Sequence, residues 1–141
     1  MLINGLVFED AGVWLADIPA VDLMVQGSSF DDAFEQIQAV FAEELAHVDC
    51  DFIWTNEAAG VFSIKLKKPG QILHEIIKRQ RQASEISIAA AARRMKKMTT
   101  EQWTQIESGV MQATAAQYFS MLDCLDLDLF FSFRKRPTQD S

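Results

Sequence analysis

Residues Ser84 to Gly109 read S-E-I-S-I-A-A-A-A-R-R-M-K-K-M-T-T-E-Q-W-T-Q-I-E-S-G and predict two short helices joined by a polar turn. Ser87 is a good N-cap for an alanine-rich helix over Ile88 to Met95, whose small side chains let another helix approach closely. Either threonine of the Thr99-Thr100 pair can cap a second helix over about Glu101 to Ser108. The glycine after it is placed to end that helix.

The two helices are predicted to have an inward apolar face and an outward polar face. From the spacing of the apolar residues, we expect the inward face to consist of Ile86, Ala91, Ala92, Met95, Met98, Trp103 and Ile106. Short hydroxyl and amide side chains and one carboxylate face outward from the second helix and its cap: Thr99, Thr100, Glu101, Gln102, Thr104, Gln105 and Ser108. Such side chains can contact base edges and phosphates, as the second helix of a helix-turn-helix does in a major groove.

The pattern I-S-x-x-x-A-A-R-R-M … M-T-x-x-x-W-x-x-I-E-x-G resembles the helix-turn-helix of XRE/Cro-type regulators over about residues 72–133. The closing I-E-S-G is its most specific part, and the resemblance implies a mainly α-helical DNA-binding domain. The chain departs from the family pattern at Ile88 and Ala89, where an outward glutamine often touches DNA. The turn Lys96-Lys97-Met98 is also one residue longer than usual. These departures motivate one alternative, a protein-interaction adaptor that does not read DNA. A second alternative is that the helices simply pack in a small bundle.

Charge divides the chain into two halves. Residues 1–64 contain 12 Asp and Glu and no Lys or Arg, whereas residues 65–141 contain all 13 Lys and Arg and 8 Asp and Glu. The net charge of −7 is therefore the sum of an acidic half and a basic half. This asymmetry suggests that the two halves have different partners. The cations predicted to contact DNA phosphates, in a salt-dependent way, are Lys78, Arg79, Arg81, Arg93, Arg94, Lys96 and Lys97.

A length of 141 residues allows one ordinary domain or two small ones. The charge cluster and Pro-Gly signal at residues 65–70 place the boundary, giving domains at 1–66 and 72–136, a linker at 67–71 and a polar tail at 137–141. No bilayer-spanning apolar run or N-terminal signal pattern is present, so a cytoplasmic protein is expected. Cys50 and Cys124 lack metal-binding spacing and His47 and His74 are isolated from them, so free thiols and no cofactor are expected.

The acidic half predicts an α+β layer of sheet and helix. Its expected strands are short and rich in β-formers: 2–8, 13–18, 21–26, 51–55 and 60–66. Between them, an amphipathic helix over residues 30–45 is capped by Ser28 or Ser29 and has Asp31 and Asp32 in its first turn. Its buried stripe is expected to be Phe30, Ala33, Phe34, Ile37, Val40, Phe41 and Leu45.

The string F-E-D-A-G-V-W-L-A-D-I-P-A-V-D-L-M-V-Q-G-S-S-F-D-D-A-F-E-Q-I-Q-A-V-F resembles the N-terminal domain of HicB-type antitoxins, over about residues 1–66. The positions that fall on that pattern are Asp17, Pro19, Gln26, Gly27, Asp32 and Ala33. The resemblance implies a partial ribonuclease-H-like fold, often followed by a DNA-binding module. Asp22-Leu23-Met24 replaces the glycine-bearing turn that is usual in the family.

The carboxylates of the acidic half have three interpretations. Asp10, Asp17 and Asp22 can form a docking face for a basic partner such as a small RNA-cleaving toxin, because complementary fields speed encounter. The same charges can simply be a solvated, solubilising face. A metal-dependent nuclease is the third hypothesis, since two-metal chemistry needs several converging carboxylates; the candidates are Asp10, Asp17, Asp22, Asp31, Asp32 and Glu35.

After the motif, Thr114 is expected to cap a helix that runs to Leu125. Its core side chains are expected to be Ala116, Phe119, Met121, Leu122 and Leu125. The following stretch, residues 127–133, alternates imperfectly and is rich in aromatic residues, which favours a strand. An isolated strand needs a partner. We therefore predict that it mediates a homodimer or higher oligomer through Leu127, Leu129, Phe131 and Phe133; pairing within the same chain is the alternative. The sequence as a whole predicts a dimeric antitoxin-type regulator that binds double-stranded operator DNA and represses its own operon.

Overall fold

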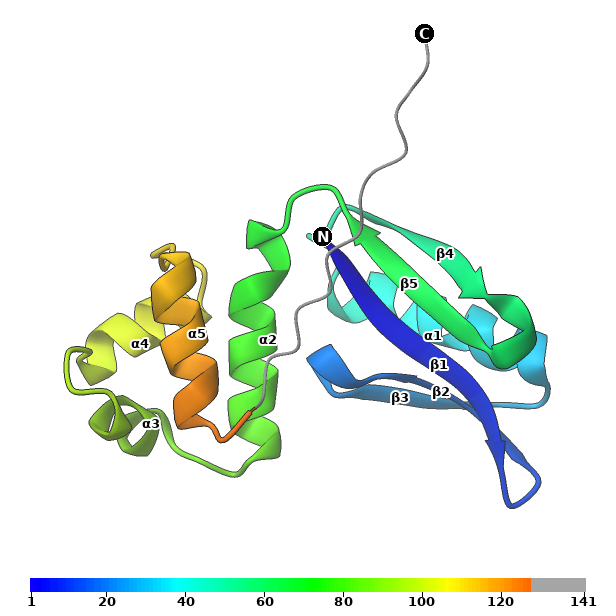
Figure 1. Ribbon diagram of the computed structural model, residues 1–141, viewed down its shortest axis with the longest axis horizontal. Helices are drawn as coiled ribbons and strands as arrows, with labels where there is room; N and C mark the ends of the chain where they lie inside the picture. Colours follow the sequence, from blue (N-terminus) through cyan, green and yellow to red (C-terminus); the bar gives the residue numbers. More distant parts are fainter. Residues whose placement is uncertain (128–141) are drawn as a thin grey trace, which may run out of the picture.

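A computed structural model describes residues 1–127 and has an α+β architecture, with a five-stranded antiparallel sheet and five α-helices (Figure 1). The elements are β1 (Leu2–Asp10), β2 (Val13–Ile18), the 3-10 turn η1 (Pro19–Val21), β3 (Leu23–Gly27), α1 (Phe30–Glu44), β4 (Cys50–Asn56), the 3-10 turn η2 (Glu57–Ala59), β5 (Val61–Leu66), α2 (Gly70–Ala83), α3 (Ile88–Arg94), α4 (Thr100–Glu107) and α5 (Ala115–Cys124).

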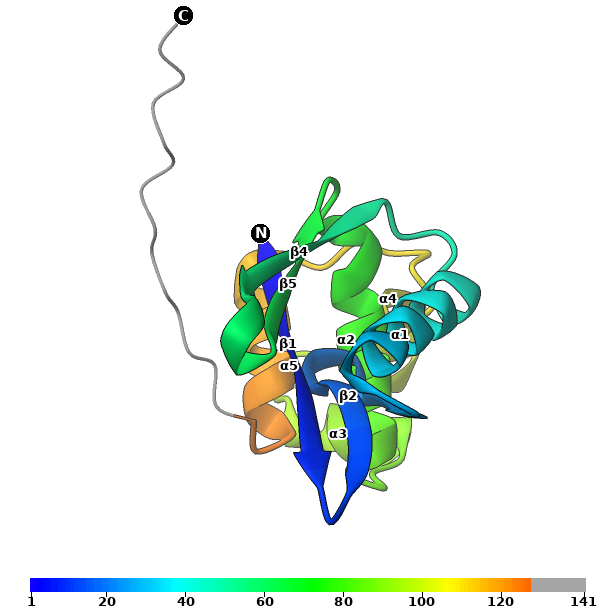
Figure 2. The same cartoon turned by 90° about the vertical axis from the view of Figure 1, so that its right-hand side faces the viewer.

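The sheet has the strand order β3-β2-β1-β5-β4, and α1 lies across one of its faces (Figures 1 and 2). Side chains alternate along the strands, so that Ile3 and Val7 of β1 are buried towards α1 while Leu2 and Leu6 point to the opposite face. The side chain of Ser29 accepts a hydrogen bond from Asp32 N and caps α1, as expected from the sequence. Ala33, Ile37 and the other buried residues of α1 complete this sheet core.

The strand predicted over residues 21–26 is present, but its predicted beginning is wrong. Pro19 starts a 3-10 turn that includes Val21, and Asp22 follows with a left-handed backbone, φ 50°. A proline fixes its own φ near the helical value, which favours a turn at this position. The strand therefore begins only at Leu23. The other expected strands and helices of the acidic half are present, with ends shifted by one or two residues.

Helix α2 belongs to both halves of the molecule. It begins at Gly70, inside the predicted linker, and stands between the sheet and helices α3 to α5 (Figure 1). Ile72 is buried in the sheet core, whereas Ile77 is buried in a second, helical core formed by α2 to α5. One amphipathic helix thus joins the two cores, and its orientation fixes the helical half against the sheet.

Helix α5 differs from the prediction in which residues it buries. Thr114 caps it as expected, but Ala116 and Phe119 are exposed and Tyr118 is buried instead. With Met121, Leu122 and Leu125, Tyr118 follows the i, i+3, i+4, i+7 spacing of one helix face. Cys50 and Cys124 are free, half-buried thiols, as expected, and burial raises the pKa of both.

The predicted C-terminal strand lies almost wholly outside the described residues. Leu129, Phe131 and Phe133 fall in residues 128–141, which the structure does not describe. Leu127 is described, and it packs against the helical core just after α5, where its backbone N–H donates to Leu122 O.

Candidate nucleic-acid interface

Helices α3 and α4 form the two-helix unit that the sequence predicts. Ser87 accepts a hydrogen bond from Ala90 N and caps α3. Thr99 caps α4 in a capping box: its side chain accepts from Gln102 N at 3.1 Å, and Gln102 Oε1 accepts from Thr99 N at 3.0 Å. Gly109 follows α4 with φ 77°, in the left-handed region that glycine tolerates best. The unit lies on the side of the helical half away from the sheet (Figure 1).

A buried ion pair holds α4 against α2. The Arg81 guanidinium donates from Nε to Glu107 Oε2 at 2.7 Å and from Nη2 to Glu107 Oε1 at 2.9 Å. Its third nitrogen donates to Ile86 O at 2.8 Å, and the Trp103 indole N–H also donates to Glu107. The Arg81 side chain is only 13% exposed, and the Glu107 side chain only 6%. This bidentate pair therefore fixes the position of α4 and of the segment that leads into α3.

The pair also changes the role of Arg81. The sequence assigned Arg81 to phosphate contact, but its guanidinium is enclosed by Glu107 and the Ile86 carbonyl. It positions α4 and is not part of the outer surface. Glu107 is the residue that the sequence reasoning missed. Its spacing from Trp103, one helical turn away on the inward face, is the signal that could have found it.

Most of the outward side chains of α4 are exposed as expected, but Gln105 is half-buried and several of the side chains already have local hydrogen bonds. Trp103 and Ile106 are fully buried on the inner face, while Thr100, Glu101 and Thr104 are exposed. Thr104 Oγ1 donates to Thr100 O at 2.8 Å, and Ser108 Oγ donates to Gln105 O at 3.0 Å. Gln102 retains its amide NH₂ as a donor beside the capping bond. The face thus combines hydroxyl, amide and one acidic side chain on a rigid helix.

Four cations cluster beside this face. Arg93, Arg94, Lys96 and Lys97 lie at the end of α3 and in the turn to α4, and all four are exposed. Arg94 donates to Cys124 O at 2.7 Å and lies 3.7 Å from Asp126, whereas Lys96 and Lys97 form no ion pair among residues 1–127. The structure therefore places this part of the predicted basic set at the beginning of α4, where phosphate contacts are expected of such a unit.

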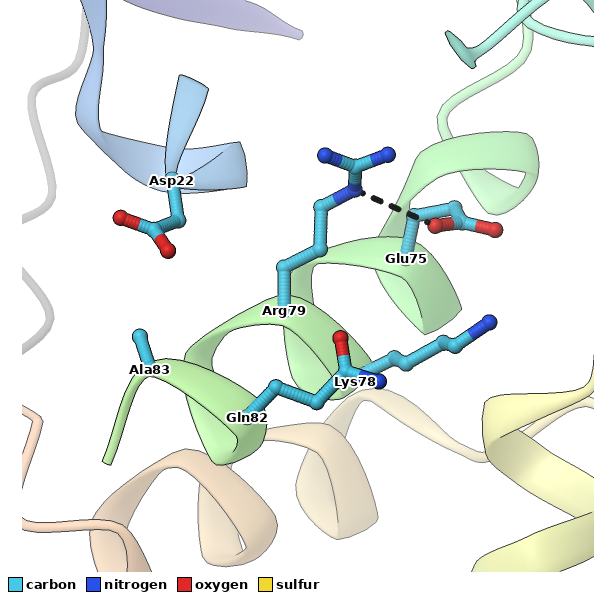
Figure 3. A pocket seen from close by; sticks show the side chains of 6 residues that line it. All are labelled: Asp22, Glu75, Lys78, Arg79, Gln82 and Ala83. Carbon is cyan, nitrogen blue, oxygen red and sulfur yellow. Dashed lines mark hydrogen bonds and ion pairs between the residues drawn. The ribbon is translucent and has the colours of Figure 1, made fainter. Parts of the chain in front are cut away.

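The remaining predicted cations, Lys78 and Arg79, lie elsewhere. Both line a cavity of ≈ 370 Å³ between α2 and the turn that carries Asp22 (Figure 3). Arg79 Nη1 donates to Glu44 Oε2 at 2.9 Å and to the Val21 carbonyl at 3.4 Å. Arg79 thus joins α2 to the sheet half, and its guanidinium is engaged there. The amide of Gln80 adds two bonds to this junction, to Pro19 O and Ala20 O.

The acidic residues predicted to bind a partner do not form one cluster. Asp17 and Asp22 are close, and burial, then the charge of Asp22, raises the pKa of the Asp17 carboxyl above its ordinary value. Asp10 lies at the β1–β2 hairpin; Leu6, not Asp10, faces Asp17 across the two strands. The sheet face opposite α1 also carries four exposed apolar side chains, namely Leu2, Leu6, Met24 and Ile53. The sheet half thus offers an apolar face with acidic residues beside it.

Among residues 1–127, three or more side chains able to ligate one metal gather only at His47, His74 and Glu75. The carboxylates named for the nuclease hypothesis are not in that group. The structure therefore brings together two histidines that show no metal-binding spacing in the sequence, because they are 27 positions apart and meet only across the junction of the two halves.

Comparison of this chain with protein-family models, with curated proteins and with solved structures gives no match. None of the helices in residues 1–127 combines the length and apolar composition needed to cross a membrane.

Proposed function

We propose that this chain is a DNA-binding transcriptional regulator of antitoxin type, with a HicB-like sheet half and an XRE-like helix-turn-helix half. The observation that carries the proposal is the outer face of α4. It presents hydroxyl and amide side chains directly after four exposed cations, two at the end of α3 and two in the turn to α4, and the Arg81–Glu107 pair holds the helix in place. Cations that reach phosphates position a protein on DNA, while polar side chains on a helix read base edges.

The proposal is tested by fluorescence-anisotropy binding to DNA from upstream of its own gene, with scrambled DNA as competitor. We expect tight binding to the upstream DNA by two chains per site, because dimers of such units bind paired half-sites. The variant Thr100→Ala/Thr104→Ala/Gln105→Ala is expected to lose about 5- to 160-fold of the preference for that DNA for each base contact it removes, at the typical 1–3 kcal/mol per good base contact. It leaves the Thr99–Gln102 capping box intact.

The control is Gln117→Ala, which removes an exposed amide side chain and one capping-box bond on α5, away from the proposed reading face. It is expected to keep the preference for the upstream DNA. A second variant, Lys96→Ala/Lys97→Ala, is expected to weaken binding to all sequences and to reduce the salt slope by about one unit per phosphate contact. Equal affinity for upstream and scrambled DNA at every salt concentration would instead support the protein-interaction adaptor.

The sheet half is proposed to bind a small basic, RNA-cleaving toxin. Residues 1–64 contain no Lys or Arg, and the sheet face opposite α1 has exposed apolar side chains beside Asp17. The cation of β5 on this face, Lys65, lies opposite Leu2 at the far end of β1 from the hairpin. If a small basic protein encoded beside this gene cleaves RNA, an equimolar amount of this chain is expected to suppress the cleavage. Met24→Lys/Leu6→Lys, which places cations on that face, is expected to abolish suppression and leave DNA binding unchanged; suppression by this variant would exclude the face.

A further inference from the structure

Two histidines that are far apart in the sequence meet at the junction of the sheet and helical halves. His47 follows α1, and His74 lies in the second turn of α2; their ring centroids are 5.6 Å apart. His74 Nε2 is 3.8 Å from Glu75 Oε1. One nitrogen of each imidazole and one carboxylate oxygen all lie within 4.8 Å of one another.

We propose that His47, His74 and Glu75 bind a divalent transition metal, with Zn²⁺ the best fit. Two imidazoles and one carboxylate are a known donor set for zinc, in which a water or another ligand takes the fourth position. Imidazole nitrogen also suits Ni²⁺ and Cu²⁺, whereas Mg²⁺ and Ca²⁺ prefer oxygen ligands. The site is therefore expected to discriminate strongly against the two alkaline-earth ions.

The geometry requires only a small contraction. Tetrahedral coordination with metal–ligand distances near 2.0–2.1 Å separates ligand atoms by about 3.4 Å, so the three donors would move together by roughly 1 Å. His47 is exposed on a loop and can make this movement. His74 and Glu75 are 15% and 17% exposed on a helix, which gives the site a fixed side.

Neighbouring groups outside the site already contact two of the three donors, Glu75 and His47. Glu75 directs Oε1 towards His74, while its other oxygen, Oε2, accepts from Arg79 Nε at 3.5 Å. The His47 ring contacts Gln71 O through Nε2 at 3.2 Å. Coordination by His47 Nδ1 would retain this bond. Outer contacts of this kind hold metal-binding side chains in position in many sites.

The site joins two segments of the chain and borders a third. It borders a cavity of ≈ 480 Å³ that Gly109, Met111 and Tyr118 also line. A Cβ atom on Gly109 would be 3.4 Å from His74 Nε2, so the end of α4 lies directly beside the site. A bound ion would therefore link the loop after α1 to α2, next to the residues that follow α4.

The test is isothermal titration of Zn²⁺, and separately of Mg²⁺, into the full chain without an affinity tag after treatment with a chelator. We expect one Zn²⁺ per chain with a dissociation constant in the micromolar range or below, a rise in melting temperature with Zn²⁺, and no response to Mg²⁺. His47→Gln is expected to weaken Zn²⁺ binding by at least about 100-fold, because loss of even an outer-shell partner costs about 10- to 100-fold and this variant removes a direct ligand. His47 is exposed, so this variant is expected to fold normally by circular dichroism.

The chain has two histidines and two cysteines, so variants of these four residues test every imidazole and every thiol that could bind the ion. Cys50→Ser/Cys124→Ser is expected to keep full affinity for Zn²⁺. Glu75→Gln and His74→Gln are expected to weaken binding as His47→Gln does. Absence of Zn²⁺ binding at micromolar concentration, unchanged affinity in His47→Gln, or loss of binding only in the cysteine variant would each overturn the proposal. Whether the metal-free chain binds DNA tests the proposed function and does not affect the metal-binding proposal.

Discussion

Replacing Arg81 by alanine is expected to destabilise the protein by about 3–5 kcal/mol, because it leaves the buried Glu107 carboxylate without its charge partner. Arg81 makes two bonds to that carboxylate and a third to Ile86 O. Water cannot replace them easily, since the Glu107 side chain is only 6% exposed. For a domain with a typical stability of about 5–15 kcal/mol, this is a large fraction of the total. Urea unfolding followed by far-UV circular dichroism measures the loss.

Two control variants distinguish the stability lost by breaking the buried Arg81–Glu107 pair from the stability lost by removing an exposed cation. Lys67→Ala removes a cation that pairs with Asp49 at 3.4 Å, where both side chains are about half exposed, and is expected to cost less than about 1 kcal/mol. Arg81→Met/Glu107→Leu removes both charges and is expected to be more stable than Arg81→Ala, because no buried charge is left unpaired. A loss below about 1 kcal/mol in Arg81→Ala would show that Glu107 finds other partners.

The elements of this fold can be predicted from the sequence where the signal is local. Ser29, Ser87, Thr99 and Thr114 each begin a helix in the structure by accepting a hydrogen bond from an N–H three residues later. A cap of this kind involves only neighbouring residues, so sequence spacing is sufficient to identify it. The alternation along the strands is also local, which is why the sheet half is recognised as α+β.

The arrangement of charged side chains depends on contacts between distant segments and could not be predicted in this way. Arg81 and Arg79 have similar sequence surroundings, yet one pairs with Glu107 on α4 and the other with Glu44 at the end of α1. The same reason explains why His47 and His74 appear isolated in sequence. Periodicity tells which face of a helix is polar, but the partner across that face is set by the packing of α2 between two cores.

Replacing Trp103 by alanine is the second large expected effect, again about 3–5 kcal/mol. Trp103 is fully buried in the helical core together with Ile77, Ala91 and Ile106. Its indole N–H also donates to Glu107, so the substitution opens a cavity and removes one hydrogen bond from a buried carboxylate. Both effects act on α4, and the proposed reading face is expected to lose its fixed position as the helix loosens.

Trp103→Phe distinguishes the two effects. Phenylalanine keeps much of the aromatic volume but cannot donate to Glu107, so we expect a smaller loss, about 1.5–3 kcal/mol, the scale of a hydrogen bond to a charged group. Urea unfolding can also be followed by tryptophan fluorescence, because Trp14 and Trp54 remain in the sheet half. If Trp103→Phe were as unstable as Trp103→Ala, the hydrogen bond to Glu107 would dominate over packing. If it were as stable as the wild type, packing alone would hold α4 in place.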